Sequence, residues 1–234
     1  MTIVLPAYNE EGNIADVVTQ WLAVAGRVDE GRVLVVDDGS RDGTNRILNG
    51  LVNQYPALSV VRQQNGGHGA AIRLGYRLAL EQGTGWIFQT DCDGQTSPGD
   101  FDAFWQRRAE APFQIGIRRS RRDPWLRIVL SRWHVWLVDL LFHAPVEDPN
   151  VPFRLMRADL VRRYLELIPV GTFAPNVLMS VLACRQGILR TLPISHSPRA
   201  AGESSVKGWQ IVKMAIRSIR EYLSFRQVVR RAIL

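Results

Sequence analysis

The sequence predicts an α/β protein built on a mainly parallel sheet. Short apolar runs that favour strands alternate with longer segments whose apolar residues recur at helical spacing, and this alternation is typical of βαβ units. One of the runs, residues 32–36, is β-branched without polar alternation, as expected for a strand buried on both faces. The chain has 234 residues, 46% of them hydrophobic, which suffices for one large domain with a substantial core.

The elements of the first half follow one another regularly. The first predicted strand, residues 2–5, ends at Pro6. The predicted helix over residues 9–25 begins at an Asn that can cap it and has an apolar face. Strands and helices then alternate over residues 32–36, 42–51, 58–61, 70–81 and 86–89.

The second half is less regular and more aromatic. A strand, an aromatic-rich stretch, a short strand, two helices, a strand and a last helix are predicted over residues 113–117, 125–142, 152–156, 158–167, 175–185, 188–194 and 207–234. We expect one domain over residues 1–206, with halves 1–120 and 121–206, followed by a basic amphipathic helix over residues 207–234.

The charge of the chain narrows the classes of partner. Its 29 Lys+Arg against 22 Asp+Glu give a net charge of +7, which suits nucleic acid, an anionic membrane surface or phosphorylated small molecules. Two cysteines, Cys92 and Cys184, are too few for a disulfide framework or a Cys-rich zinc site, and they favour a reducing compartment. We expect neither a secretory signal nor a transmembrane helix, because the chain has no pattern for either.

Polar clusters follow three of the predicted strands, over residues 8–10, 37–40 and 91–95. Ligands of open parallel sheets bind at the carboxyl ends of the strands. In the last cluster, Asp91 and Asp93 can face one hard cation, which takes oxygen ligands and tolerates diphosphate oxygens in its shell. Gln95 can add a carbonyl ligand or hydrogen-bond one. The alternative is a solvated Asp-rich turn.

Two further loops can serve a nucleotide. The acidic side chains of residues 37–44 can accept hydrogen bonds from a base or a ribose, and Ser40 or Asp42 can also cap the following helix. The Gly-rich turn over residues 65–69 opens a helix, where exposed N–H groups can bind an anion. A simple tight turn is the alternative for this segment.

Four segments in this order, residues 6–11, 37–44, 65–69 and 91–95, resemble the family-2 glycosyltransferases of GT-A fold, a Rossmann-like sheet flanked by helices. The four segments in order are more specific than any one of them alone. A looser match to the same family continues through residues 116–118, 148–156 and 199–204. The chain looks most like the dolichyl-phosphate mannose synthase and polyprenyl-phosphate glycosyltransferase branch.

The resemblance implies a role for each matching residue. A nucleotide-diphosphate sugar would be bound by Pro6, Tyr8, Glu10, Val36, Asp37, Asp38, Asp91, Cys92 and Lys207. Mg²⁺ or Mn²⁺ would be held by Asp91 and Asp93, with Gln95 beside it. The catalytic residues would be Asp93, Arg118, Arg199 and Asp148. The role of Lys207 stays open, because the Gly-x-Ser-Lys pattern of this branch is replaced here by residues 202–205, Gly-Glu-Ser-Ser.

The acceptor implied by this resemblance is a lipid phosphate rather than a sugar hydroxyl. A hydroxyl acceptor needs a general base, yet no Asp or Glu occurs between Leu167 and Gly202, and residues 173–176 are Phe-Ala-Pro-Asn where such a base is expected. A phosphate is already anionic and needs cations, for which Arg118, Arg154, Arg199 and Lys207 are candidates. Asp148 stays open as a base, and the alternative is a turn residue before Pro149.

Two segments favour contact with a membrane surface. Residues 125–142 combine three Trp with Leu, Ile and Val but also carry charges, which suits an interfacial helix rather than a spanning one. Arg119, Arg121 and Arg122 precede it and can meet anionic headgroups. The C-terminal helix is basic and amphipathic as well. The alternatives are an ordinary buried helix or a contact with a second copy of the chain.

The sequence thus predicts an inverting hexosyltransferase that uses a UDP- or GDP-sugar and a polyprenyl phosphate, in the cytoplasm and peripheral to the inner face of the membrane. A glycosyltransferase acting on a glycan hydroxyl is the first alternative, and a nucleotidyltransferase is the second. A non-catalytic binding module is less favoured. Nucleic-acid binding is disfavoured, because the basic residues accompany apolar ones rather than a recognition motif.

Overall fold

The structure, a computed structural model, describes the backbone of residues 1–118, 125–197 and 208–233 and the side chains of residues 1–118, 131–197 and 217–230. In these ranges one sheet has seven strands in the order β3-β2-β1-β4-β6-β5-β7. The strands are β1 (Thr2–Ala7), β2 (Arg32–Asp37), β3 (Leu58–Arg62), β4 (Trp86–Thr90), β5 (Phe113–Arg118), β6 (Phe153–Arg157) and β7 (Leu189–Ile194).

The sheet is mainly parallel, as predicted, with one exception. β3, β2, β1 and β4 form a parallel block, and β5 and β7 pair in parallel. β6 lies between β4 and β5 and runs antiparallel to both. The sequence predicts this strand but not its direction, because direction depends on how the chain returns from the preceding helix.

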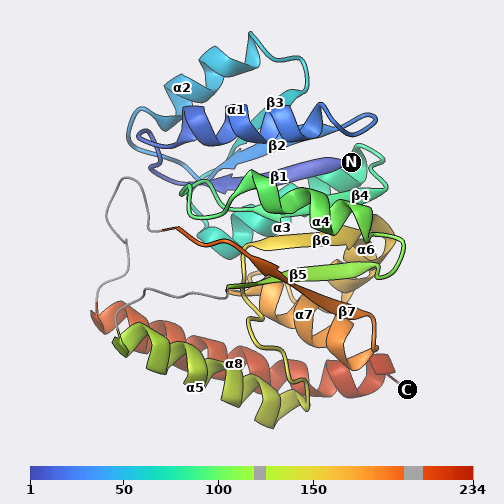
Figure 1. The fold of residues 1–234 in the computed structure, drawn as a ribbon. Coiled ribbons are helices and arrows are strands. Elements are labelled where there is room, and N and C mark those ends of the chain that lie inside the picture. Colours follow the sequence, from blue (N-terminus) through green and yellow to red (C-terminus); the bar gives the residue numbers. More distant parts are fainter. Residues whose placement is uncertain (119–124, 198–207, 234) are drawn as a thin grey trace.

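Helices cover both faces of the sheet. They are α1 (Ile14–Ala25), α2 (Thr44–Val52), α3 (His68–Glu81), the 3₁₀ turn η1 (Pro98–Asp100), α4 (Phe101–Gln106), α5 (Trp125–Phe142), α6 (Ala158–Leu167), α7 (Pro175–Arg185) and α8 (Gly208–Ile233). Figure 1 shows α1, α2 and α4 over one face and α3, α6 and α7 over the other. The sequence does not predict the turn η1 and α4, since a helix of six residues is too short to show a clear period.

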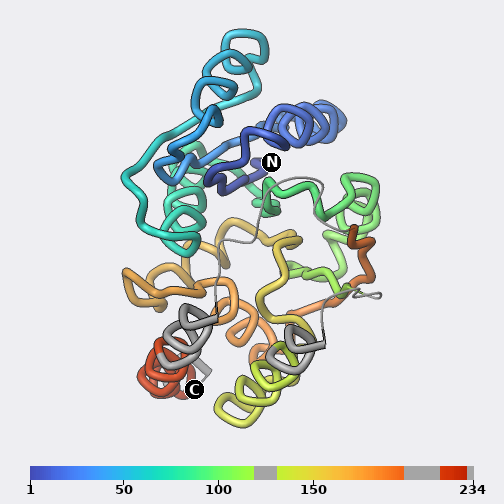
Figure 2. The backbone as a smooth tube through the Cα atoms, turned by 90° about the vertical axis from the view of Figure 1, so that its left-hand side faces the viewer, coloured from blue at the N-terminus to red at the C-terminus, as the bar shows by residue number. Residues whose placement is uncertain are grey.

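The helices α5 and α8 pack against each other at the end of the molecule that carries β5 and β7 (Figures 1 and 2). The His134 ring and the Tyr222 hydroxyl lie 2.7 Å apart, and the Phe142 ring packs on Tyr222 and Phe225. The apolar face of α8 is thus partly used within the chain. In the described part of the chain, no helix is both long and apolar enough to cross a bilayer.

An aromatic cluster ties the two halves of the sheet together. Trp21 of α1 packs on Phe88 of β4 and Phe153 of β6, with ring centroids 5.1 and 6.1 Å away. Phe101 and Phe104 of α4 complete the cluster. Aromatic pairs of this kind stabilise a core beyond the area they bury.

The glycine at position 75 lets α3 lie directly on the sheet. A Cβ there would lie 2.4 Å from Cγ1 of Val4 and 3.3 Å from Cγ2 of Val36, whereas a Cβ at Gly50 of α2 would meet nothing within 4 Å. We expect Gly75→Ala to lower the free energy of unfolding by roughly 1–3 kcal/mol through overpacking. We expect the matched Gly50→Ala to raise it by up to about 1 kcal/mol through helix propensity. Urea denaturation measures both, and equal effects would contradict this account of the α3 contact.

Candidate active site

A cavity of about 440 Å³ opens where β1, β2 and β4 end. This is the edge at which an open parallel sheet binds its ligands. The cavity is lined by Pro6, Ala7, Tyr8, Glu10, Asp38, Asn65, Gly67, His68, Ala71, Asp91, Cys92 and Asp93. An adjoining hollow, lined by Gly39, Arg41 and residues 62–65, shares Tyr8 and Asn65 with it. The polar clusters that follow the first, second and fourth strands therefore meet at one place.

Four carboxylates, those of Glu10, Asp38, Asp91 and Asp93, give this cavity a negative character. The pKa of the Asp91 carboxyl is raised to about 6, chiefly by burial. The charges of His68 and Arg118 act to lower this pKa, whereas those of Asp93 and Glu10 act to raise it. The His68 Nε2 atom lies 3.7 Å from Asp91 Oδ1. A cation bound between the carboxylates would relieve their mutual repulsion.

The donor set fits a hard divalent cation that also takes ligands from a bound molecule. Asp91 and Asp93 line the same cavity, but no group of three or more His, Cys, Asp or Glu side chains among the described residues is placed to hold a metal alone. The remaining coordination positions would fall to other oxygens, such as those of a diphosphate. Gln95 does not line this cavity. Its amide donates to the Ser197 carbonyl at 3.3 Å, while its backbone N–H donates to Asp93 Oδ1 at 3.0 Å.

The two acidic residues at the end of β2, Asp37 and Asp38, have different surroundings. Asp38 lines the cavity, and its carboxylate accepts hydrogen bonds from the Gln63 side chain at 2.6 Å and from the N–H groups of Gly66 and Gly67 at 2.8 and 2.9 Å. Asp37 is fully buried, and its carboxylate stabilises the turn over residues 37–40 by accepting a hydrogen bond from the Ser40 N–H at 2.9 Å.

Val36, Asp37 and Asp38 were expected to bind the nucleotide-diphosphate sugar, and the structure brings Asp38 to the cavity. Val36 and Asp37 are both fully buried and are not part of its lining. The alternation of side chains along β2 sends the Val36 side chain into the contact with α3.

The loops after β1 and β2 hold each other in place. The Asn9 N–H donates to the Ser40 hydroxyl at 3.0 Å, and the Glu10 N–H donates to the Thr44 hydroxyl at 2.8 Å. Asn9 has a φ of 55°, in the left-handed region that Asn tolerates better than most residues. These bonds set the positions of Tyr8 and Glu10 at the rim.

A second cavity, of about 660 Å³, lies between the end of β5, helix α5 and residues 145–148. Arg118, at the end of β5, donates to both carboxylate oxygens of Asp148, at 2.8 and 3.1 Å. Both residues line this cavity. Because Arg118 also lowers the pKa of Asp91, its charge acts on the first cavity as well.

Arg154 was expected to contact a phosphate, and this expectation is wrong. The side chain is fully buried and donates to the carbonyls of Pro149, Val151 and Asn176. Through these hydrogen bonds the guanidinium supports the loop that carries Asp148. Arg199, Lys207 and residues 202–205 lie outside the described residues, so their expected roles stay predictions.

A hydrogen-bonded chain behind Asp91 has no signal in the sequence. The Tyr76 hydroxyl donates to Asn176 at 2.8 Å, the Asn176 amide donates to Gln89 at 2.9 Å, and the Gln89 amide donates to Asp91 at 3.2 Å. Sequence reasoning also misses His68. Its one sequence signal is its place at the start of the helix that follows the Gly-rich turn.

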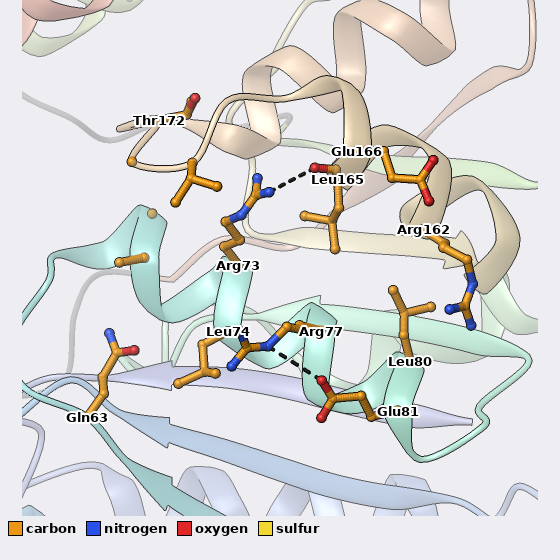
Figure 3. Close-up of a pocket in the computed structure, with 14 residues that line it drawn as sticks. Gln63, Arg73, Leu74, Arg77, Leu80, Glu81, Arg162, Leu165, Glu166 and Thr172 are labelled. Carbon is orange, nitrogen blue, oxygen red and sulfur yellow. Dashed lines mark hydrogen bonds and ion pairs between the residues drawn. The ribbon is translucent and has the colours of Figure 1, made fainter.

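A cavity of about 810 Å³ lies between α3, α6 and residues 170–172 (Figure 3). Its walls combine Leu74, Leu80 and Leu165 with the Arg77–Glu81 ion pair. It does not contain the paired carboxylates and lies apart from the carboxyl ends of β1, β2 and β4, so its size does not make it the candidate site.

A family model described as Glycosyl transferase family 2 matches residues 2–168. The chain belongs to this family, as the four ordered motifs indicate. The overall fold is also similar to that of solved glycosyltransferase structures. One is glucosyl-3-phosphoglycerate synthase from Mycobacterium tuberculosis in complex with Mn²⁺, UDP and phosphoglyceric acid. It has a TM-score of 0.67 and 18% identity, over 96% of this chain and 78% of that one. The expected GT-A fold is confirmed.

Two curated relatives carry names that bear on the acceptor. The polyprenol monophosphomannose synthase of Mycolicibacterium smegmatis is 27% identical over 219 residues, which cover 89% of this chain and 82% of the relative. The undecaprenyl-phosphate 4-deoxy-4-formamido-L-arabinose transferase of Pseudomonas paraeruginosa is 28% identical over 225 residues, 92% of this chain. The chain spans 62% of the length of that second relative.

Proposed function

We propose that the protein transfers a hexose from a nucleotide-diphosphate sugar to a polyprenyl phosphate. The observation that carries this proposal is the position of Asp91 and Asp93 in a cavity at the strand ends, with the Arg118 charge acting on it from a second cavity. The names of both curated relatives, a polyprenol monophosphomannose synthase and an undecaprenyl-phosphate sugar transferase, support the same acceptor class.

The first cavity is the proposed donor site. Asp91 and Asp93 would hold Mg²⁺ or Mn²⁺ together with the donor diphosphate, and the metal would neutralise charge on the departing nucleoside diphosphate. Tyr8 and Glu10 line the nucleotide side of the cavity, and Asp38 fixes the turn that precedes α3.

The second cavity is the proposed acceptor site. Arg118 and Arg132 supply guanidinium groups, beside the carboxylates of Asp139, Glu147 and Asp148, and the apolar walls come from Val135, Trp136 and Val146. Guanidinium groups suit phosphate, and apolar walls suit a prenyl chain. An acceptor phosphate oxygen would attack the anomeric carbon opposite the leaving nucleoside diphosphate, so the configuration inverts. No proton needs to be removed from the acceptor.

The pairing of Asp148 favours a lipid phosphate over a hydroxyl acceptor. Both of its carboxylate oxygens accept hydrogen bonds from Arg118. In this role Asp148 orients the cation that meets the phosphate, whereas a general base for a hydroxyl needs an oxygen aimed at the substrate.

An acceptor competition tests the proposal. Wild-type protein receives radiolabelled UDP- and GDP-sugars with polyprenyl phosphate and an oligosaccharide side by side. We expect label in the lipid fraction and release of a nucleoside diphosphate. Label in the oligosaccharide alone would establish the glycan alternative, and release of pyrophosphate would establish a nucleotidyltransferase.

The α5–α8 pair is the proposed membrane-contacting surface. Trp133, Trp136 and Leu140 of α5 and Leu223 of α8 are large apolar side chains that are 42–57% exposed. Exposed basic side chains accompany them at Arg132, Arg217, Arg220 and Arg230. Apolar and basic groups on one surface favour an anionic lipid interface. A contact between two copies of the chain is the other use of such a surface.

Removing two of the exposed rings tests this surface. We expect the double variant Trp133→Ala/Trp136→Ala to bind anionic vesicles at least about tenfold more weakly, because each ring contributes apolar area to the interface. Val52→Ala, which trims an exposed apolar residue of α2 at the other end of the molecule (Figure 1), should bind as wild type. Vesicle co-sedimentation measures both. Unchanged vesicle binding with loss of a dimer would assign the surface to self-association instead.

A further inference from the structure

The loop between α6 and α7, residues 168–174, is fastened at its start by α3. Arg73 of α3 donates from Nη1 to the Ile168 carbonyl at 2.9 Å and from Nη2 to the Leu165 carbonyl at 2.8 Å. Figure 3 shows the second of these bonds, with Thr172 of the loop on the far side of Arg73. A cationic side chain at the C-terminal carbonyls of a helix is a favourable cap.

The same loop is fastened at its end by α8. Both carboxylate oxygens of Glu221 accept from the Phe173 N–H at 3.0 Å, and Arg217 donates to the Gly171 carbonyl at 2.8 Å. Arg217 also donates to Glu221 at 3.1 Å, and its guanidinium lies 5.5 Å from the centre of the Phe173 ring. The Glu221 side chain is 19% exposed, so solvent screens these contacts only in part.

The loop backbone presses against the first turn of α3. A Cβ on Gly69 would lie 2.3 Å from the Phe173 carbonyl oxygen and 2.8 Å from that of Thr172. Glycine is therefore required there for the close approach. Any shift of residues 172–173 would therefore also change the position of Gly69.

That first turn of α3 belongs to the proposed donor site. His68 and Gly67, directly before Gly69, line the donor cavity. His68 Nε2 lies 3.7 Å from Asp91 Oδ1, and the Gly67 N–H donates to Asp38 at 2.9 Å. A continuous path of contacts thus runs from Glu221 through Phe173 and Gly69 to the donor carboxylates.

We propose that Glu221 is a positioning residue for the donor site, acting through the Phe173 N–H. By holding residues 171–173 against Gly69, it fixes the turn that presents His68 and Gly67 to the donor cavity. Donor affinity then depends on the docking of α8, the helix that also carries part of the proposed membrane surface. The inference rests on the proposed donor site and adds a residue of the C-terminal helix to it.

The test compares three variants by calorimetric titration with UDP and GDP in the presence of Mn²⁺. We expect Glu221→Ala to raise the dissociation constant about tenfold, the effect of losing one charge-assisted hydrogen bond that the site depends on. Glu221→Gln keeps an oxygen that accepts from the Phe173 N–H, so it should stay within about threefold of wild type. Glu81→Ala breaks the analogous Arg77–Glu81 pair within α3 and leaves the bonds of Arg73, Arg217 and Glu221 to the loop in place, so its affinity should not change.

The outcomes separate the role of Glu221 from the donor site itself. A folded Glu221→Ala protein with wild-type nucleotide affinity, or an equal loss in Glu81→Ala, would overturn the role of Glu221 while leaving the donor site intact. Should Glu221→Ala not fold, Glu221→Asp takes its place, because its side chain is one methylene shorter and withdraws the carboxylate from the Phe173 N–H; wild-type affinity in that variant would equally overturn the inference. A wild-type protein that binds neither nucleotide would overturn the proposed function itself.

Discussion

Asp93→Asn is expected to abolish sugar transfer while the fold survives. The substitution keeps the shape of the side chain and removes one of the two carboxylates, Asp91 and Asp93, that are proposed to hold the metal in the donor cavity. Loss of a residue that merely supports a metal ligand costs about 10–100-fold in metal affinity or activity, and loss of a ligand should cost at least about a hundredfold. A transfer assay with labelled donor at saturating Mn²⁺ measures the effect.

The control for this variant removes a carboxylate elsewhere. Asp16 lies exposed in the first turn of α1, outside the donor cavity. Asp16→Asn should transfer sugar at the wild-type rate. Near-normal transfer by Asp93→Asn, with a wild-type melting curve, would remove this residue from the metal site.

Arg154→Met is expected to lower the free energy of unfolding by about 2–5 kcal/mol, because each buried polar group left without its partner costs about 1–3 kcal/mol. The fully buried guanidinium makes five hydrogen bonds, to the carbonyls of Pro149, Val151 and Asn176 and to the Ser180 hydroxyl. A methionine side chain fills much of the volume of the arginine, but it leaves the carbonyl oxygens and the Ser180 hydroxyl without the hydrogen bonds that Arg154 donates.

A neighbour on the same strand provides the comparison. The Arg157 side chain is half exposed and pairs with Asp159 at the surface. Arg157→Met should therefore cost no more than about 1 kcal/mol. Urea denaturation of both variants gives the two values. A loss below about 1 kcal/mol for Arg154→Met would mean that the loop carrying Asp148 does not depend on this side chain.

The first half of the fold follows from local signals. Three of the four strands of the parallel block are short apolar runs that stop at a polar cluster, and the carboxyl ends of parallel strands bring those clusters together. The sequence therefore predicts one shared site for Tyr8, Glu10, Asp38 and the paired carboxylates, and all of them line the same cavity. Local patterns suffice here because consecutive βαβ units have one favoured hand.

The features that the sequence does not predict depend on contacts between distant segments. The antiparallel direction of β6 is set by its pairing with β4 and β5, which no local pattern encodes. An arginine is ordinarily exposed, so the burial of Arg154 cannot be inferred without the carbonyls that surround it. His68 and the Tyr76–Asn176–Gln89 chain likewise become visible only when α3, α7 and β4 are placed side by side.

Donor binding is the most direct measure of the proposed site. Wild-type protein is titrated calorimetrically with a panel of UDP-, GDP- and dTDP-sugars, once with Mn²⁺ and once with a chelator. We expect one nucleotide class to bind with Mn²⁺, and the heat of binding to disappear with the chelator and in Asp93→Asn. Binding of no donor under either condition, or equal binding by wild type and Asp93→Asn, would contradict the assignment of Asp91 and Asp93 to a metal-dependent donor site.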